Sequence, residues 1–219
     1  MNEQEIKMQW QQISQQWDEN LIISKSNELD IKHMKIVHLI TSMRPLKLFT
    51  LLVGVLWVGF GFVILSNLII HDFSGTSKFF LFSALGQLIL TAIAIAIYVF
   101  QLVRISQVDI TDPIVKTQQT IAELKSSTLW SVRILFLQLP LWTTFWWTEH
   151  ILQTWQVWQW VVVVNITLLF IIAAAWIFLN VKAENKGKPW FKFLFSGNEW
   201  IPLMKSLEIL EESGEFTEK

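Results

Sequence analysis

The chain has 219 residues, of which 53% are hydrophobic and only 16% charged, and its formal net charge is −1. A soluble domain usually carries about 25% charged residues, and the deficit is concentrated in a few segments, which indicates a membrane protein. The absence of cysteine excludes disulfide bonds, thiolate catalysis and cysteine-based metal sites. The near-neutral charge gives no indication that the chain binds nucleic acid.

The N-terminal region, residues 1–45, is predicted to be cytoplasmic and helical. A second helix in it is predicted from Ser26 towards Met43, and Pro45 is expected to separate this helix from the membrane. The first part is rich in glutamine and glutamate, but apolar residues recur in it at helical spacing. They predict one apolar helix face, formed by Ile6, Trp10, Ile13 and Trp17.

Four segments are predicted to span a membrane, because a helix needs ~20 mostly apolar residues to cross ~30 Å of hydrocarbon. The third is the least regular, since it contains Arg133, Gln138 and Pro140. A span there is still expected, because without it the flanking loops would lie on opposite sides of the membrane. The sequence thus predicts an all-α integral membrane four-helix bundle with short cytoplasmic amphipathic helices. Its membrane domain covers residues 46–181, with spans at about 48–70, 79–103, 129–148 and 158–181.

Lysine and arginine predict the orientation, since they are enriched on the cytoplasmic side. They flank the loop between the second and third spans and follow the fourth span, whereas residues 71–78 and 149–157 carry only Lys78. Both termini are therefore expected in the cytoplasm. A cytoplasmic helix is predicted at about 112–127, with Asp112 as N-cap, and residues 182–219 are predicted to form an interfacial tail.

Six of the thirteen tryptophans lie between Trp142 and Trp160, at the outer ends of the third and fourth spans. Tryptophan faces can bind sugars or cations, which makes an aromatic binding platform one interpretation. Tryptophan is also enriched at membrane–water boundaries. We interpret the cluster as an interfacial belt that fixes the depth of the hairpin.

No nucleotide, hydrolase or metalloprotease motif is present, so we expect neither an enzyme nor a cofactor. Gly54, Gly59 and Gly61 lie inside the first span and predict close helix packing. Polar residues inside the spans favour hydrogen bonds between helices, although they are also compatible with a transport path. They are Gln87, Gln138, Asn165 and Thr167.

A possible metal or pH-sensitive site lies on the outer side. Histidine and carboxylate side chains bind zinc, and one such pair closes the first span while another closes the third. The four candidate ligands are His71, Asp72, Glu149 and His150. His33 and His38 are five residues apart, do not share a helix face and are expected to be solvated.

Four sequence stretches resemble a group of small four-span membrane proteins of Bacteroidota, whose genes often stand beside an extracytoplasmic-function sigma factor. They are "IKMQWQQISQQWDENL", "RPLKLFTLLVGVLWV", "SKFFLFSALGQLILTAIAIAIY" and "TQQTIAELKSSTLWSVRILFLQLPLW", and the resemblance covers roughly residues 5–180. The resemblance implies a multi-pass inner-membrane protein that restrains a sigma factor through its cytoplasmic tail.

The sequence thus predicts a non-catalytic regulatory or scaffold protein. Its expected partners are the lipid bilayer, a cytoplasmic protein such as a sigma factor, and a second copy of the chain. The face of Ile6, Trp10, Ile13 and Trp17 is the predicted partner-binding surface. It could equally pack on the predicted central cytoplasmic helix or on lipid headgroups. A transporter or channel component and a metal- or pH-responsive sensor are the alternative functions.

Overall fold

A computed structural model describes residues 3–109, 111–196 and 200–215, and all regular secondary structure in these residues is helical. The elements in chain order are α1 (Glu3–Ser42), α2 (Arg44–His71), α3 (Lys78–Ser106), α4 (Ile114–Phe136), α5 (Leu139–Thr144), α6 (Glu149–Thr154), α7 (Val157–Asn180), the short 3-10 helix η1 (Ala183–Asn185), α8 (Pro189–Leu194) and α9 (Ile201–Glu215).

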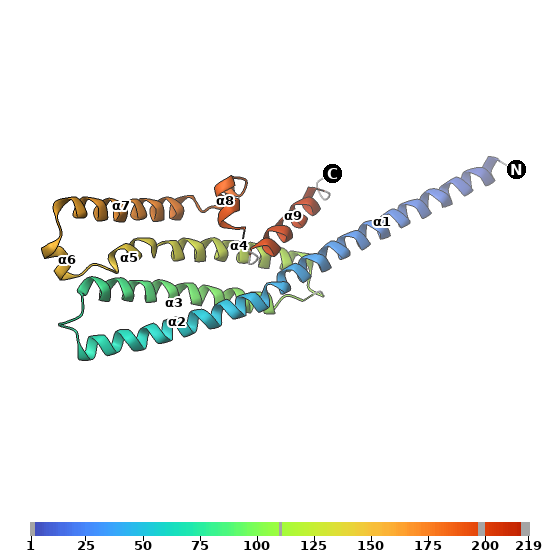
Figure 1. Ribbon diagram of the computed structural model, residues 1–219. Coiled ribbons are helices and arrows are strands. Elements are labelled where there is room, and N and C mark those ends of the chain that lie inside the picture. The colour runs from blue at the N-terminus through green and yellow to red at the C-terminus, as the bar shows by residue number, and fades with distance from the viewer. Residues whose placement is uncertain (1–2, 110, 197–199, 216–219) are drawn as a thin grey trace.

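The long helices lie side by side in a row, with α2 at one edge and α7 at the other (Figure 1). Packing joins α2 to α3, α3 to α4 and α5, and α4 and α5 to α7. The row has two ends. The α6 end holds the turn between α2 and α3, and the α8 end holds α8, α9 and the base of α1 (Figure 1).

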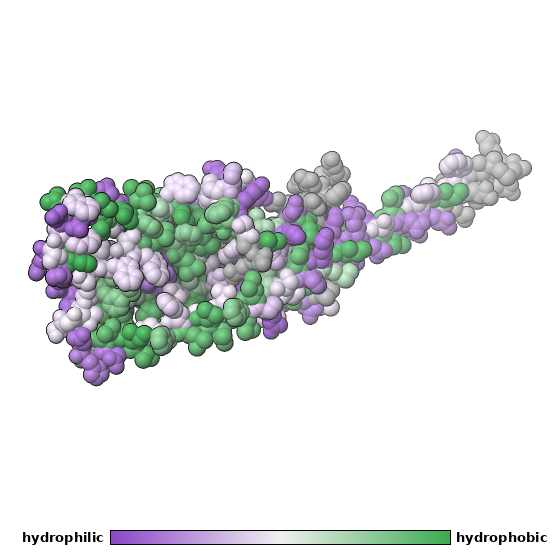
Figure 2. Space-filling view, viewed as in Figure 1, coloured by the Kyte–Doolittle hydropathy of each residue, from purple (hydrophilic) through white to green (hydrophobic). Residues whose placement is uncertain are grey.

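Three helical stretches are long and apolar enough to cross a membrane, and this indicates a membrane protein. They are Ile13–His71, which includes α2, then Lys78–Ser106 and Val157–Asn180. The expected spans at 48–70, 79–103 and 158–181 coincide with α2, α3 and α7. Hydrophobic side chains cover the flank of the row, whereas hydrophilic ones are frequent along α1 (Figure 2).

The expected span at 129–148 is not a single long helix. The helix in front of it continues into the segment, but α4 ends at Phe136 and α5 begins at Leu139. Pro140 lies in the first turn of α5, where its missing N–H is not needed but where it prevents a continuous helix. Gln138 lies between α4 and α5 and donates from Nε2 to Thr91 Oγ1 of α3 at 2.9 Å. This hydrogen bond joins the interruption between the two helices to α3.

One helix of 40 residues replaces the two helices predicted before the first span. No glycine or proline interrupts residues 3–42, so nothing in the local chemistry ends the helix between Trp17 and Ser26. Pro45 does not separate the N-terminal helix from the first span as predicted. It lies in the first turn of α2, and only Met43 stands between α1 and α2.

A small hydrophobic core lies at the α8 end, beyond the predicted spans at 48–70 and 79–103. It joins the base of α1 to the end of α3, the first half of α4 and α9. Its buried members are Ile36, Ile40, Met43, Ile105, Ile121, Leu124, Leu203 and Leu207. The buried residues of α1, α4 and α9 recur at helical spacing, and the structure shows that these faces pack on one another.

Two of the three glycines of α2 contact α3 closely. A Cβ on Gly61 would lie 2.6 Å from Cδ2 of Leu88, and one on Gly54 would lie 3.2 Å from Cγ1 of Ile95. The prediction of close helix approach is correct for these two positions. It is wrong for Gly59, where a Cβ would meet nothing within 4 Å.

Candidate interaction surface

The N-terminal half of α1 projects beyond the row of helices (Figure 1). Trp10, Ile13 and Trp17 are 69%, 46% and 67% exposed, and Leu21 continues the apolar surface at 64%. The predicted side chain of Ile6 lies outside the residues whose side chains the structure describes. The structure therefore does not show these three residues packed on the chain's own central cytoplasmic helix, which is the alternative prediction. We call Trp10, Ile13, Trp17 and Leu21 the α1 face.

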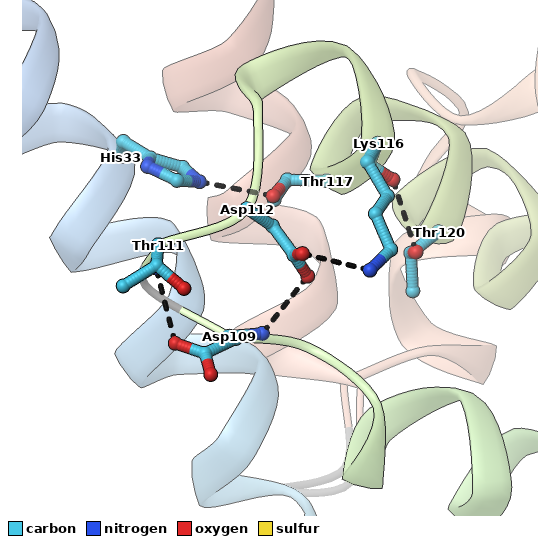
Figure 3. A network of polar contacts seen from close by, with 7 residues as sticks. All are labelled: His33, Asp109, Thr111, Asp112, Lys116, Thr117 and Thr120. Atoms are coloured by element: carbon cyan, nitrogen blue, oxygen red, sulfur yellow. Dashed lines mark hydrogen bonds and ion pairs between the residues drawn. The ribbon is translucent and has the colours of Figure 1, made fainter.

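The base of α1 is fixed by a buried polar contact as well as by the small core. His33 is only 8% exposed, and its Nε2 lies 2.9 Å from Oγ1 of Thr117 on α4 (Figure 3). The prediction that His33 is solvated is wrong, because α4 covers this side of α1. His38 is exposed, as predicted.

The turn in front of α4 is closed by carboxylates (Figure 3). Asp112 accepts from Lys116 Nζ at 2.7 Å and from the backbone N–H of Asp109 at 3.2 Å. These hydrogen bonds, with Lys116 contributing most, lower the pKa of the Asp112 carboxyl below its usual range. Asp112 is not the N-cap that the sequence predicts, since that position belongs to Pro113 and the helix begins at Ile114.

The projecting half of α1 is acidic. Residues 3–24 carry Glu3, Glu5, Asp18 and Glu19 against Lys7, a side-chain charge of −3. Further along, Lys32 Nζ lies 2.8 Å from Glu28 Oε1, and this hydrogen bond lowers the pKa of the Glu28 carboxyl. An acidic helix is repelled by the anionic inner surface of a membrane. Its charge therefore favours a protein partner over lipid headgroups.

The predicted metal ligands are at the α6 end of the row (Figure 1), but the structure does not gather them into a site. His71 turns back to its own helix, with Nδ1 3.2 Å from the Asn67 carbonyl oxygen. Among the described residues, no three His, Cys, Asp or Glu side chains are close enough to hold a metal ion. His71, Asp72, Glu149 and His150 therefore give no geometric support to a metal site.

The polar residues inside the spans behave differently from one another. Gln138 bonds to α3, as predicted, whereas Asn165 and Thr167 bond to carbonyl oxygens of their own helix, those of Val161 and Val163. Hydrogen bonding within one turn satisfies these two groups without a neighbouring helix. Gln87 is buried, and its Nε2 has no hydrogen-bond partner among the described residues. It lines a cavity of about 190 Å³ between α2 and α3.

The tryptophan-rich stretch forms a chain of aromatic contacts at the α6 end. Trp160 contacts both Trp147 and Trp155, with ring centroids 5.9 and 5.8 Å apart, and Trp147 also contacts Phe79 of α3 at 5.6 Å. The edge-to-face contact of Trp147 with Trp160 ties the loop after α5 to α7, and its tilted contact with Phe79 ties the same loop to α3. Trp146 and Trp158 remain 70% and 62% exposed.

Sequence reasoning missed a second buried polar cluster at the α8 end. Lys47 is 1% exposed and donates from Nζ to Gln101 Oε1 at 2.6 Å. The ammonium lies 4.6 Å from the ring of Tyr98 and 5.3 Å from that of Trp200. Because these residues are far apart in the sequence, no local pattern could have found the cluster.

Comparison with protein-family models, with curated proteins and with solved structures finds no match. The class of protein therefore rests on the fold alone. In the part of the chain that the structure describes, all regular secondary structure is helical, three helical stretches are able to cross a membrane, and one long helix projects from the row.

Proposed function

We propose that the chain is a non-catalytic regulatory or scaffold protein of a bacterial inner membrane that holds a cytoplasmic protein on its α1 face. The observation that carries the proposal is the exposure of Trp10, Ile13 and Trp17 on a helix that projects beyond the membrane-spanning row. An apolar stripe on a free helix binds a hydrophobic groove, and large aromatic side chains provide most of the energy at such contacts.

In this proposal the chain crosses the membrane four times. The end of α4 and α5 form the additional crossing, which is supported by their packing between α3 and α7. Both termini then lie at the α8 end. That end is cytoplasmic by the positive-inside rule, because the turns of the α6 end carry only Lys78. The α1 face consequently faces the cytoplasm.

The acidic charge of residues 3–24 favours a partner whose groove has a basic rim. The sequence resemblance makes an extracytoplasmic-function sigma factor the first partner to test. Binding on α1 would keep such a factor at the membrane and away from its target, with no chemical step by this chain.

A cross-linked pull-down from native membranes tests the proposal with a matched pair of variants. Trp17→Glu places a charge on the α1 face, whereas Gln15→Glu places the same charge 200° away around the helix, because successive residues are 100° apart. We expect Trp17→Glu to lose a protein that the wild type and Gln15→Glu both retain. Mass spectrometry identifies this protein, and circular dichroism checks that both variants remain helical.

Retention of the same proteins by all three forms would show that the α1 face does not bind them. Loss from both variants would instead indicate a general effect of added negative charge and would equally contradict binding through the face.

A further inference from the structure

The segment after α7 folds back onto the end of that helix. The rings of Trp190 in α8 and Trp176 in α7 are 4.8 Å apart. Phe191 and Phe195 are buried, with stacked rings 4.4 Å apart. Because α7 is apolar enough to span a membrane, α8 is held at the level where the hydrocarbon layer meets water.

An open pocket of about 230 Å³ lies between α8 and α9. Its apolar wall is formed by Phe191, Phe195, Ile201 and Met204. Three lysines and one carboxylate form the rest of its lining: Lys186, Lys192, Lys205 and Glu208.

The polar part of this pocket favours an anion. All three lysines are exposed, and they outnumber Glu208. Within the described residues, Lys192 and Lys205 form no ion pair. An anion in the pocket would therefore be attracted without first breaking a salt bridge of either side chain.

The surroundings of the pocket favour a lipid over a soluble anion. Phe193 of α8 is 83% exposed, the highest value among the large hydrophobic residues of the described chain. An aromatic side chain beside lysines at the end of a spanning helix is typical of a segment inserted at the bilayer boundary. The same position would bring an acyl chain against the apolar wall while the headgroup meets the lysines.

We propose that this pocket binds an anionic phospholipid of the adjoining leaflet, with the headgroup phosphate among Lys186, Lys192 and Lys205. Lysines near an anionic headgroup attract it, so the three side chains together favour a lipid with net negative charge over a zwitterionic lipid. The site is independent of the α1 face, which lies on the projecting helix. Either proposal can therefore fail alone.

The test measures lipid binding to the full-length protein in detergent by native mass spectrometry. The probes are dioleoylphosphatidylglycerol, dioleoylphosphatidylcholine and the soluble glycerol 1-phosphate. We expect the wild type to bind phosphatidylglycerol at least about tenfold more tightly than phosphatidylcholine, and glycerol 1-phosphate only weakly, since it lacks the acyl chains.

Three variants connect the preference to the pocket. K186Q/K192Q/K205Q should lose it, whereas K7Q/K25Q/K35Q, which removes the same charge from exposed positions of α1, should keep it. E208Q should bind phosphatidylglycerol more tightly, because it removes a carboxylate that lines the pocket. This last variant tests the site even if the triple variant does not fold.

Equal binding of the two lipids by the wild type would overturn the proposal. So would an equal loss in the two triple variants, or unchanged binding in E208Q. Binding of glycerol 1-phosphate as tight as that of phosphatidylglycerol would identify a site for soluble anions instead.

Discussion

Two cationic side chains near the ends of the predicted spans, those of Lys47 and Arg133, form hydrogen bonds with other parts of the protein that the sequence does not indicate. Lys47 and Arg133 lie near the ends of the first and third predicted spans, where the positive-inside rule only requires cations to lie near water. In the structure Lys47 is buried against Gln101, and Arg133 donates from Nε to the Val181 carbonyl oxygen at 2.8 Å. A cation at a helix C-terminus stabilises the unpaired carbonyls there, so Arg133 caps α7.

Removal of the Lys47 ammonium should destabilise the protein. Lys47→Ala leaves the buried Gln101 amide oxygen without its donor, and we expect the free energy of unfolding to fall by about 1–3 kcal/mol. Denaturant unfolding of the detergent-solubilised protein, followed by tryptophan fluorescence, measures the change. Lys35→Ala, at an exposed position of α1, is the control and should change little. A loss no larger than that of the control would show that the contact contributes nothing.

At the scale of elements, the pair α2 and α3 is built on glycines that face the neighbouring helix. Without a strong hydrophobic driving force in lipid, spanning helices associate through close packing, which small residues allow. The sequence identifies the three glycines of α2 but not which of them faces α3. Gly61 lies against Leu88, whereas Gly59 points into open space.

Valine at these two glycines should therefore have different effects. The single methyl group of Gly61→Ala would require only a rotation of the Leu88 side chain. The branched side chain of Gly61→Val is larger and must displace the Leu88 methyl group. We expect Gly61→Val to cost about 1–3 kcal/mol and Gly59→Val to be close to neutral. Thermal unfolding of both variants in the same detergent measures the difference. Equal stabilities would mean that α2 does not approach α3 through Gly61.

At the scale of the whole molecule, the structure joins a row of helices, three stretches of which are able to cross a membrane, to one long helix. The 40 residues of α1 extend about 60 Å at 1.5 Å per residue. Among the described residues, only the base of α1 is covered, by α9, by the first half of α4 and by the ends of α2 and α3. The α1 face is thereby held away from the row by a helix instead of a flexible tail.

The continuity of α1 is testable by distance measurement. The chain contains no cysteine, so spin labels on Gln16→Cys and His38→Cys are unique. The two positions are 22 residues apart, and a continuous helix places them about 33 Å apart along its axis. Electron–electron double resonance should give one narrow distribution near this value. A broad or clearly shorter distribution would indicate a hinge between two separate helices, as the sequence analysis predicts.

The sequence by itself determined the helical class and the three apolar helices able to cross a membrane, because hydrophobic length and spacing are local properties. It also predicted short amphipathic helices outside the spans, each with an apolar face. Only the tertiary structure decided which of these faces are covered. The faces of α4 and α9 meet the base of α1 in one core, while Trp10 and Trp17 remain exposed. Burial of His33 and Lys47 depends on residues distant in the chain, and no periodic pattern carries that information.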